Sequence, residues 1–392
     1  MSNLVPKQHR LAGRVALLVL GGAAAAALWA QQPASQPGDE VIRLRDAQQQ
    51  VFRAALRAVA PCIVRIDTIG GAMPVEEMGA PGEEPVAAPT FRQADGPTTG
   101  VIAAADGYIL TSSFNFVRDP AVITISLADG RRFVGRLIAR DRPAGLTLLK
   151  IDARNLPVPH WLPRESLRPG QWALVAGYGH GTATPALSVG VVSALDRLDG
   201  RAVQTDAKTS PANYGGPVFD IEGRVMGICV PKAGGEDEIA GVEWYDSGIG
   251  FAIHADYVRE RLPRLQAGQE LERGLAGLRF ESAEPVVGVP DPAVPEDGVR
   301  IVAVAPGPAA DAGLRPDDVI THLNGRPVAR LRALRRELVR AAPGDTVQIG
   351  FRRAGEQAAV AVTLVRVEEL QARAGTTTQP ASQPATPTGG PP

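Results

Sequence analysis

The chain has 392 residues, which is enough for two or three domains of ordinary size. Hydrophobic residues make up 44% and charged residues 21%, so most of the chain can bury a core and general disorder is excluded. The formal charge is −1, from 41 basic and 42 acidic residues, which argues against a nucleic-acid-binding protein.

The first 30 residues have the pattern of an export signal. Basic residues, among them Lys7 and Arg14, precede an unbroken apolar run over residues 15–30 that ends in the small residue Ala30. This run is short for a membrane span, which needs about 20 residues. A cleaved signal peptide is therefore favoured over an uncleaved N-terminal anchor in the inner membrane. Either way, we expect the body of the protein to be exported, to the periplasm or another extracytoplasmic space.

Residues 31–60 are predicted to form a linker followed by an amphipathic helix. Leu44, Val51 and Val59 recur at helical spacing within residues 40–60. At the other end of the chain, residues 367–392 are rich in Pro, Thr, Gln and Gly. Such a composition has too little apolar surface to bury, so it predicts a disordered tail.

Residues 61–263 are predicted to be β structure. Short alternating apolar runs, as at 63–66, 122–125 and 225–230, are separated by Gly, Pro or Asp-Gly turns. Many short strands at this spacing indicate a sandwich or a barrel. Residues 70–97, rich in Pro, Gly and Glu, are expected to form a long mobile loop. A linker is predicted at 264–272, followed by a second β-rich unit with one clear helix at 273–366.

Two ordered sets of motifs within these β-rich units resemble known families. The first set is Gly100-Val-Ile-Ala-Ala-Ala-Asp-Gly-Tyr-Ile-Leu-Thr111, Gly215-Gly-Pro-Val218 and Ser247-Gly-Ile-Gly-Phe-Ala-Ile253, and the second is Gly307-Pro-Ala-Ala-Asp-Ala-Gly-Leu314 and Pro343-Gly-Asp-Thr-Val347. The first set resembles the HtrA/Deg family of trypsin-like serine proteases, and the second resembles a PDZ domain. The resemblance implies a mainly β protein, with a trypsin-like double β-barrel over 61–263 and a PDZ domain, β-rich with one or two helices, over 273–366.

The resemblance implies a serine endoprotease, but the residues of its chemistry are replaced. Such an enzyme needs a nucleophilic hydroxyl, an imidazole base and an orienting carboxylate. Where the family has the catalytic His, this sequence has Phe114. Where the family has the Asp that opens an Asp-Leu-Ala-x-Leu-Lys strand, this sequence has Gly145. The Ser of the family's Gly-Asn-Ser-Gly-Gly-Pro is Tyr214. We therefore predict no catalytic residues at the triad positions Phe114, Gly145 and Tyr214, which is the pattern of a pseudoprotease.

The alternative is an active serine endopeptidase that uses an unrecognised set of catalytic residues. Ser112, Ser113 and Ser210 lie near the triad positions in sequence, but turn chemistry explains them better. His180 lies in a Gly-rich loop, where a solvated histidine is expected more often than a recruited base. A reactive-serine probe would discriminate the two hypotheses.

Two further replacements concern the expected substrate site. Ala212 stands where the family has a glycine whose amide helps form the oxyanion hole, and a β-carbon there is costly if the backbone needs a positive φ. Lys208 stands where such barrels build the floor of the specificity pocket. We expect Lys208 and Tyr214 to crowd that pocket.

The PDZ-like unit implies peptide binding. PDZ domains add a ligand terminus as a strand beside an edge strand, with a helix as the other wall. The resemblance places the carboxylate-binding loop at Leu275, Ala276, Gly277 and Leu278, and the helix wall near Leu334 and Leu338, which would face either the groove or the core. The exposed face of this helix is rich in Arg, which either favours acidic ligands or is simply solvated.

The expected partners follow from this reading of the second unit. They are unfolded polypeptides or protein C-termini, bound in protein quality control or in the regulation of active paralogues. A homo-trimer, or an assembly with active HtrA-like proteases, is a further expectation from the family. The alternative is that the PDZ-like unit only packs against other parts of an oligomer.

Cysteine and histidine usage gives no metal site. Two cysteines, Cys62 and Cys229, are too few for a four-ligand zinc site, and two buried free thiols are favoured over one bridge. The five histidines fall in no metal-ligand spacing. No cofactor is expected.

Overall fold

The computed structural model describes residues 37–70, 97–116, 119–179, 182, 184–231, 248–280 and 298–376. The predicted export signal, nearly all of the loop predicted at 70–97 and His180 lie outside these residues. Contacts between residues divide the chain into two units, 1–53 and 54–392. Within the described ranges, no helix is both long and apolar enough to cross a membrane.

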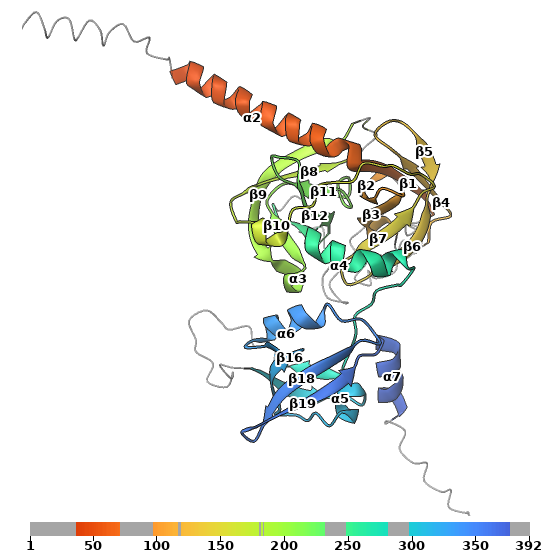
Figure 1. Cartoon of the computed structure of the whole chain (residues 1–392), viewed down its shortest axis with the longest axis vertical. Coiled ribbons are helices and arrows are strands. Elements are labelled where there is room, and N and C mark those ends of the chain that lie inside the picture. The colour runs from red at the N-terminus through yellow and green to blue at the C-terminus, as the bar shows by residue number, and fades with distance from the viewer. Residues whose placement is uncertain are drawn as a thin grey trace, which may run out of the picture. The chain divides into compact units, whose positions relative to one another are not determined.

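The helix predicted before the β structure is present as α2 (Pro37–Val59), which Figure 1 shows as a long orange-red helix. In its last turns Ala55 and Val59 are buried. Gly223, in a turn with φ +79°, lies so close that a β-carbon there would come within 2.8 Å of the Ala58 β-carbon. Pro61 then ends the helical backbone in a short 3-10 turn.

The first sheet has seven strands in the order β5-β4-β1-β2-β3-β7-β6. Its apolar side chains alternate along each strand and meet in a core that includes Ile66, Ile109 and Ile125, all fully buried. This sheet supplies two of the three expected triad positions, at the ends of β3 and β7. Its strands are β1 (Ile63–Ile69), β2 (Pro97–Ala104), β3 (Tyr108–Ser112), β4 (Val122–Ser126), β5 (Arg132–Val134), β6 (Arg136–Asp141) and β7 (Leu146–Lys150).

The second sheet closes into a six-stranded barrel in the order β10-β13-β12-β11-β8-β9. Its own core contains Val175, Val218 and Cys229, and a separate cluster around Leu148, Ile228 and Ile253 joins the two sheets. The strands are β8 (Trp172–Gly177), β9 (Ala186–Asp196), β10 (Ala202–Thr205), β11 (Pro217–Phe219), β12 (Val225–Val230) and β13 (Gly250–His254), with the short helix α3 (Arg197–Gly200) between β9 and β10.

The helix α4 (Ala255–Gln266) follows the barrel and packs on β6, β12 and β13 (Figure 1). It takes the first three residues of the segment predicted as a linker at 264–272. Leu271, in the rest of that segment, is buried and donates its amide to the Arg140 carbonyl at 2.8 Å. Because this apolar residue is bound to β6, the linker is anchored along the first sheet before the next domain begins.

The PDZ-like unit is built on a sheet in the order β14-β15-β16-β18-β19, with β17 beside β16. Its core gathers Ile301, Ile320, Ile349 and Phe351 from the three strands β15, β16 and β18. The elements are β14 (Leu278–Phe280), β15 (Val299–Val304), α5 (Pro308–Asp311), β16 (Val319–Leu323), β17 (Arg326–Pro327), α6 (Leu331–Leu338), β18 (Thr346–Arg353) and β19 (Glu356–Thr363). The architecture is mainly β, as predicted.

The prediction of a disordered tail from residue 367 is wrong for its first ten residues, which form α7 (Val367–Thr376). A β-carbon on Gly277 or Gly307 would lie 3.2 or 2.6 Å from Leu370 Cδ1, so this leucine packs on backbone that glycine leaves open. Arg373 also pairs with Asp311 at 2.8 Å. The polar composition of the whole tail concealed these contacts, because they depend on two residues of the tail and on partners far away in sequence.

Candidate functional site

The first two expected triad positions are held together by the turn after β3. Residues Ser113–Asn115 form a 3-10 turn in which the Ser112 hydroxyl accepts the Phe114 amide at 3.2 Å. The Ser113 amide donates to the carbonyl of Gly145 at 2.8 Å, and the Ser113 hydroxyl shares a hydrogen bond of 2.9 Å with that of Thr147. Positions 114 and 145 are therefore held close together, on either side of this hydrogen bond.

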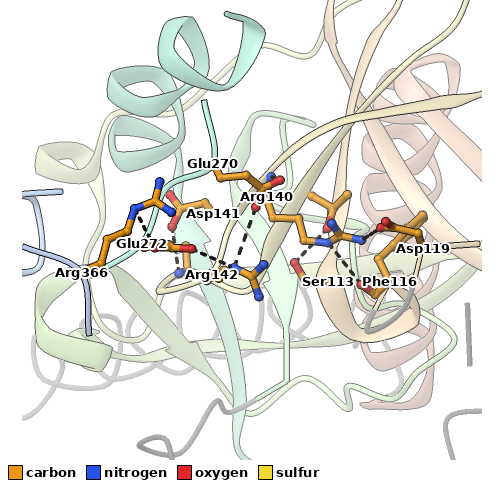
Figure 2. Close-up of polar contacts among 11 residues, drawn as sticks. Ser113, Phe116, Asp119, Arg140, Asp141, Arg142, Glu270, Glu272 and Arg366 are labelled. Carbon is orange, nitrogen blue, oxygen red and sulfur yellow. Dashed lines mark hydrogen bonds and ion pairs between the residues drawn. The ribbon is translucent and has the colours of Figure 1, made fainter. Parts of the chain in front are cut away.

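Arg140 on β6 fixes the segment that follows Phe114. Figure 2 shows its guanidinium reaching toward Phe116 and Asp119. Its Nε donates to the Phe116 carbonyl at 3.2 Å, and an Nη pairs with the Asp119 carboxylate at 2.6 Å. The Arg140 amide in turn donates to the Glu270 carboxylate at 3.2 Å. The turn that carries position 114 is thus bound at both of its ends.

The side chains at the first and third expected triad positions, Phe114 and Tyr214, are aromatic rings that contact each other. Phe114 and Tyr214 make an edge-to-face contact, with ring centroids 5.3 Å apart and planes inclined by 69°. Tyr214 is only 6% exposed, and Phe114 packs partly against the same core of the second barrel. Such a pair contributes about 0.5–1.5 kcal/mol beyond the burial of its surface. The two replacements therefore form one packed unit that joins the first sheet to the second barrel.

The backbone amide at position 214 is used within its own turn. The amides of Asn213 and Tyr214 both donate to the carbonyl of Ser210, at 3.0 and 3.1 Å. An oxyanion hole in a trypsin-like site is made by the amides of the nucleophile and of the residue two positions before it, both pointing at the substrate. In this turn the Tyr214 amide points at a protein carbonyl instead.

Two threonines on β2 hold this turn in place. Thr99 Oγ1 donates to the Ala212 carbonyl at 2.9 Å and accepts the Tyr178 amide at 2.7 Å. Thr98 Oγ1 donates to the Tyr214 carbonyl at 3.1 Å. Both threonines are buried, so these hydrogen bonds are shielded from water and are costly to leave unmade.

The Gly-Gly pair after Tyr214 is required by packing rather than by catalysis. Gly215 has φ +84°, and a β-carbon there would come within 2.2 Å of the Thr99 carbonyl oxygen. A β-carbon on Gly216 would come equally close to the Ala176 carbonyl oxygen.

Two expectations about the neighbouring positions are revised. Ala212 is absent from the described residues with positive φ, so its β-carbon causes no backbone strain, and it fits because its neighbour is Gly179. Lys208 is exposed, and its carbonyl accepts the Asn213 side-chain amide at 3.3 Å. The buried group at the expected pocket is therefore Tyr214, not Lys208.

Ser112, Ser210 and the buried His254 each make hydrogen bonds within the fold, those of Ser210 through its backbone amide. Ser112 caps the turn at Phe114, and the Ser210 amide donates to the Asn213 side-chain oxygen at 2.7 Å. His254 is buried at the start of α4, where its Nδ1 accepts the Tyr257 amide at 3.1 Å and its Nε2 lies 3.0 Å from the Gly200 carbonyl. Burial lowers the pKa of His254, which favours the neutral ring that this capping bond needs.

Both cysteines are free and buried. Burial raises the pKa of the Cys62 thiol to about 11 and raises that of Cys229 further, so both remain protonated thiols. Among the described residues, no group of three or more His, Cys, Asp or Glu side chains could hold a metal ion.

The second candidate site is the loop before β14. Leu275 is bound to Val365 through both backbone hydrogen bonds, at 2.9 and 3.0 Å. The carbonyls of Ala276 and Gly277 accept the amides of Ala309 and Ala305. No described residue accepts the amides of Ala276 or Gly277, whereas their carbonyls are both engaged. Two adjacent donors at the start of an edge strand are what a terminal carboxylate requires.

The helix expected to form the groove wall is α6. Leu334 is fully buried in the core of this unit, so it supports the helix and does not line a groove. Leu338 is half-buried at the edge of the same core. Of the two alternatives that the sequence left open for Leu334, the core is therefore the correct one.

Comparison with known proteins agrees with both parts of this architecture. A model of the trypsin-like peptidase domain matches residues 98–228, and a PDZ domain model matches residues 274–364. A probable periplasmic serine endoprotease, DegP-like, from Chlamydia muridarum is 31% identical over 276 residues, covering 69% of this chain and 54% of that protein. The chain belongs to the HtrA/Deg family.

Other members of the HtrA/Deg family give the same picture. The periplasmic pH-dependent serine endoprotease DegQ of Escherichia coli is 32% identical over 274 residues, covering 67% of this chain and 58% of that protein. The chain thus spans somewhat more than half the length of these relatives. A crystal structure of the serine endoprotease from Yersinia pestis superposes with a TM-score of 0.57 at 26% identity, covering 80% of this chain and 97% of that one. The HtrA-type protease AlgW with a tripeptide gives 0.61 at 25% identity, covering 80% and 96%.

Sequence reasoning within the HtrA/Deg frame missed the residues that lock the turn. Thr98, Thr99 and Arg140 lie far in sequence from the positions that they fix, and only the pairing of the strands brings them there. It also missed a buried charged cluster between β6 and α4. The Asp141 carboxylate accepts the Ala144 amide at 3.1 Å, and the Tyr257 hydroxyl lies 3.5 Å away. Burial raises the pKa of Asp141.

Proposed function

We propose that this chain is an exported HtrA-like protein that does not cleave peptide bonds and binds unfolded chains or protein C-termini through its PDZ domain. The observation that carries the first half is the Phe114–Tyr214 contact of 5.3 Å at the positions of the base and the nucleophile. The observation that supports the second half is that no described residue accepts the amides of Ala276 and Gly277.

Acyl transfer requires a base, a nucleophile and an oxyanion hole, and the geometry argues against each of the three. A phenylalanine ring cannot accept a proton, so a hydroxyl at position 214 would have no base at position 114. Tyrosine has a pKa near 10 in water and is a poor nucleophile at neutral pH without a base. The amide of residue 214 is turned to the Ser210 carbonyl at 3.1 Å. An enzyme whose triad is removed still accelerates the reaction roughly 10³–10⁴-fold over water, and this remaining acceleration depends on a formed oxyanion hole.

Peptide capture requires only features that the PDZ domain retains. A carboxylate bound by backbone amides makes charge-assisted hydrogen bonds, which are roughly twice as strong as neutral ones. Gly277 has φ +82°, a backbone conformation that glycine adopts without strain. An affinity in the micromolar range, about −8 kcal/mol, is reasonable for one short added strand. Relatives are named as periplasmic endoproteases, and we propose quality control or regulation of active paralogues as the role of this binding.

The first test asks for proteolysis directly. The full chain is incubated with unfolded casein and with a fluorophosphonate probe, beside an active member of the family. We expect no cleavage and no labelling. Labelling that disappears when one particular serine is changed to alanine would favour the alternative, an active endopeptidase with an unrecognised residue set, and would identify its nucleophile.

The second test measures peptide binding by fluorescence anisotropy, with a library of peptides that carry either a free or an amidated C-terminus. We expect binding of free acids, marked weakening on amidation, and weakening again in Gly277→Val. The matched control is Gly325→Val, since Gly325 also has a positive φ, of +76°, but nothing lies within 4 Å of its β-carbon position. Equal binding of acids and amides, or none, would leave the PDZ domain as a packing unit only.

Export is tested separately from binding. Residues 1–40 are fused to a reporter that is active only outside the cytoplasm, and we expect activity because of the basic region and the apolar run over 15–30. A reporter that stays inactive inside the cell would contradict the proposal. The length of the chain recovered after export then distinguishes a cleaved signal from an inner-membrane anchor.

A further inference from the structure

Strand β14 lies at one edge of the PDZ sheet and carries a single charged residue, Arg279. The strand pairs with β15 and with no other strand that the structure describes. Leu278 and Phe280 are half-buried and pack against the core of the domain, whereas Arg279 between them is exposed. Because successive side chains of a strand point to opposite faces, Arg279 lies on the face of β14 that is turned away from this core.

The surroundings of Arg279 leave its positive charge without a partner. The guanidinium forms no hydrogen bond or ion pair with any other described residue. Its neighbour across the strands is Ala303, which is too small to cover it. The strands β14, β15 and β16 contain no acidic residue, and Arg300 on β15 adds a second positive charge. A ligand strand added at this edge therefore meets a positive charge that no neighbouring strand neutralises.

The direction of such a ligand strand follows from the carboxylate-binding loop. The amides of Ala276 and Gly277, which no described residue accepts, come immediately before β14. A chain whose terminal carboxylate binds these amides must run back along β14 as an antiparallel strand. Its last residue then lies beside Leu278, and its penultimate residue lies opposite Arg279. Residues opposite each other in antiparallel strands share one face, with β-carbons about 5 Å apart.

We propose that the PDZ domain prefers C-termini with an acidic penultimate residue, because Arg279 pairs with that side chain across the two strands. This inference rests on the proposed peptide binding and narrows the class of its ligands. The last residue and the antepenultimate residue point to the other face, which Leu278 and Phe280 make apolar. An exposed pair of opposite charges across two strands has a modest effect, so we expect a preference of about two- to fivefold over a neutral side chain of the same shape.

The test compares pools of octapeptides with a free C-terminus for binding to the immobilised full chain. Each pool has Glu, Gln or Lys fixed at the penultimate or at the antepenultimate position and is random elsewhere. Mass spectrometry measures the retained fraction. At the penultimate position, we expect the Glu pool to be retained about two- to fivefold more than the Gln pool, and the Lys pool less than either. At the antepenultimate position, we expect no such gain for Glu.

A charge reversal in the protein tests the role of Arg279. The variant Arg279→Glu should invert the preference at the penultimate position, so that the Lys pool is retained most. The matched control is Arg352→Glu, which makes the same change of charge on β18. Strands β15 and β16 lie between β14 and β18, so at about 4.8 Å per strand the control is roughly 14 Å away, beyond the Debye length of about 8 Å at physiological ionic strength. The control should keep the preference for Glu.

The outcomes separate this inference from the proposed function. Equal retention of the Glu and Gln pools, the same gain for Glu at both positions, or a preference for Glu that survives Arg279→Glu would overturn the inference. If free acids still bind better than amidated peptides in those cases, the proposed peptide binding stands. Binding of no free-acid pool would overturn both.

Discussion

The replacement of Tyr214 by serine is the sharpest test of the aromatic contact. The reversion supplies the hydroxyl that the family uses, yet we expect loss of stability and no gain of activity. Tyr214 is 6% exposed, and a tyrosine of this kind buries about 150–250 Å², worth roughly 4–6 kcal/mol at about 25 cal/mol per Å². Large-to-small changes of buried aromatics measured in other proteins cost about 3–5 kcal/mol. We expect about 4 kcal/mol for Tyr214→Ser.

The assay is urea unfolding followed by tryptophan fluorescence. Trp161 and Trp172 report on the second barrel, and residues 273–366 contain no tryptophan, so the PDZ domain does not contribute to the signal. With a slope of about 2–3 kcal/mol per M, a loss of 4 kcal/mol lowers the midpoint by roughly 1.5 M. Tyr214→Phe keeps the ring contact with Phe114 and should stay within about 1 kcal/mol of the unaltered chain.

Two results would refute the reasoning about Tyr214. An unchanged midpoint for Tyr214→Ser would mean that the ring is not a packed part of the barrel. Cleavage of casein by this variant would mean that a residue other than Phe114 acts as the base for the hydroxyl at position 214. The double variant Phe114→His with Tyr214→Ser should also remain inactive while the amide of residue 214 is bound to the Ser210 carbonyl.

Three pH-dependent predictions concern the buried titratable groups, each measured as the unfolding midpoint against pH. Burial raises the pKa of Asp141 in the folded protein. The stabilisation that comes from its protonated form is therefore lost as the pH rises from 3.8 through the raised pKa. The variant Asp141→Asn should lose less stability between about pH 4 and 7 than the unaltered chain. Burial lowers the pKa of His254, so stability should fall as the pH drops below 6.5, and His254→Asn, which keeps a capping side chain, should remove that fall; an identical fall in the variant would contradict it. Burial acts to raise the pKa of Asp318, but the Arg353 guanidinium, at 2.7 Å, and the Arg315 amide together lower it, so its stabilisation is lost as the pH falls below 3.8. Asp318→Asn should lower the thermal stability of the PDZ domain at pH 7 because it removes the carboxylate that pairs with Arg353 and accepts the Arg315 amide, and circular dichroism of thermal unfolding measures the change.

Much of the fold followed from local pattern. The spacing of Leu44, Val51 and Val59 predicted α2, and the helix at Leu331–Leu338 followed from three leucines on one face. The alternating strands separated by Gly and Asp-Gly turns indicated a barrel because side chains alternate across a strand wherever one face is buried. The helix α7 escaped prediction because its stability depends on Leu370 meeting Gly277 and Gly307, which are distant in sequence.

The sequence by itself predicts which chemistry is lacking at the positions that correspond to the triad. A phenylalanine, a glycine and a tyrosine in place of a base, a carboxylate and a hydroxyl have properties that do not depend on how the chain folds. The tertiary structure decided what takes the place of that chemistry. The edge-to-face contact of Phe114 with Tyr214, and the Tyr214 amide bound to Ser210, exist only because the turn after β3 and the turn before β11 are brought together by two different sheets. Distances of a few ångströms between residues a hundred positions apart are set by strand pairing and core packing, and no local pattern encodes them.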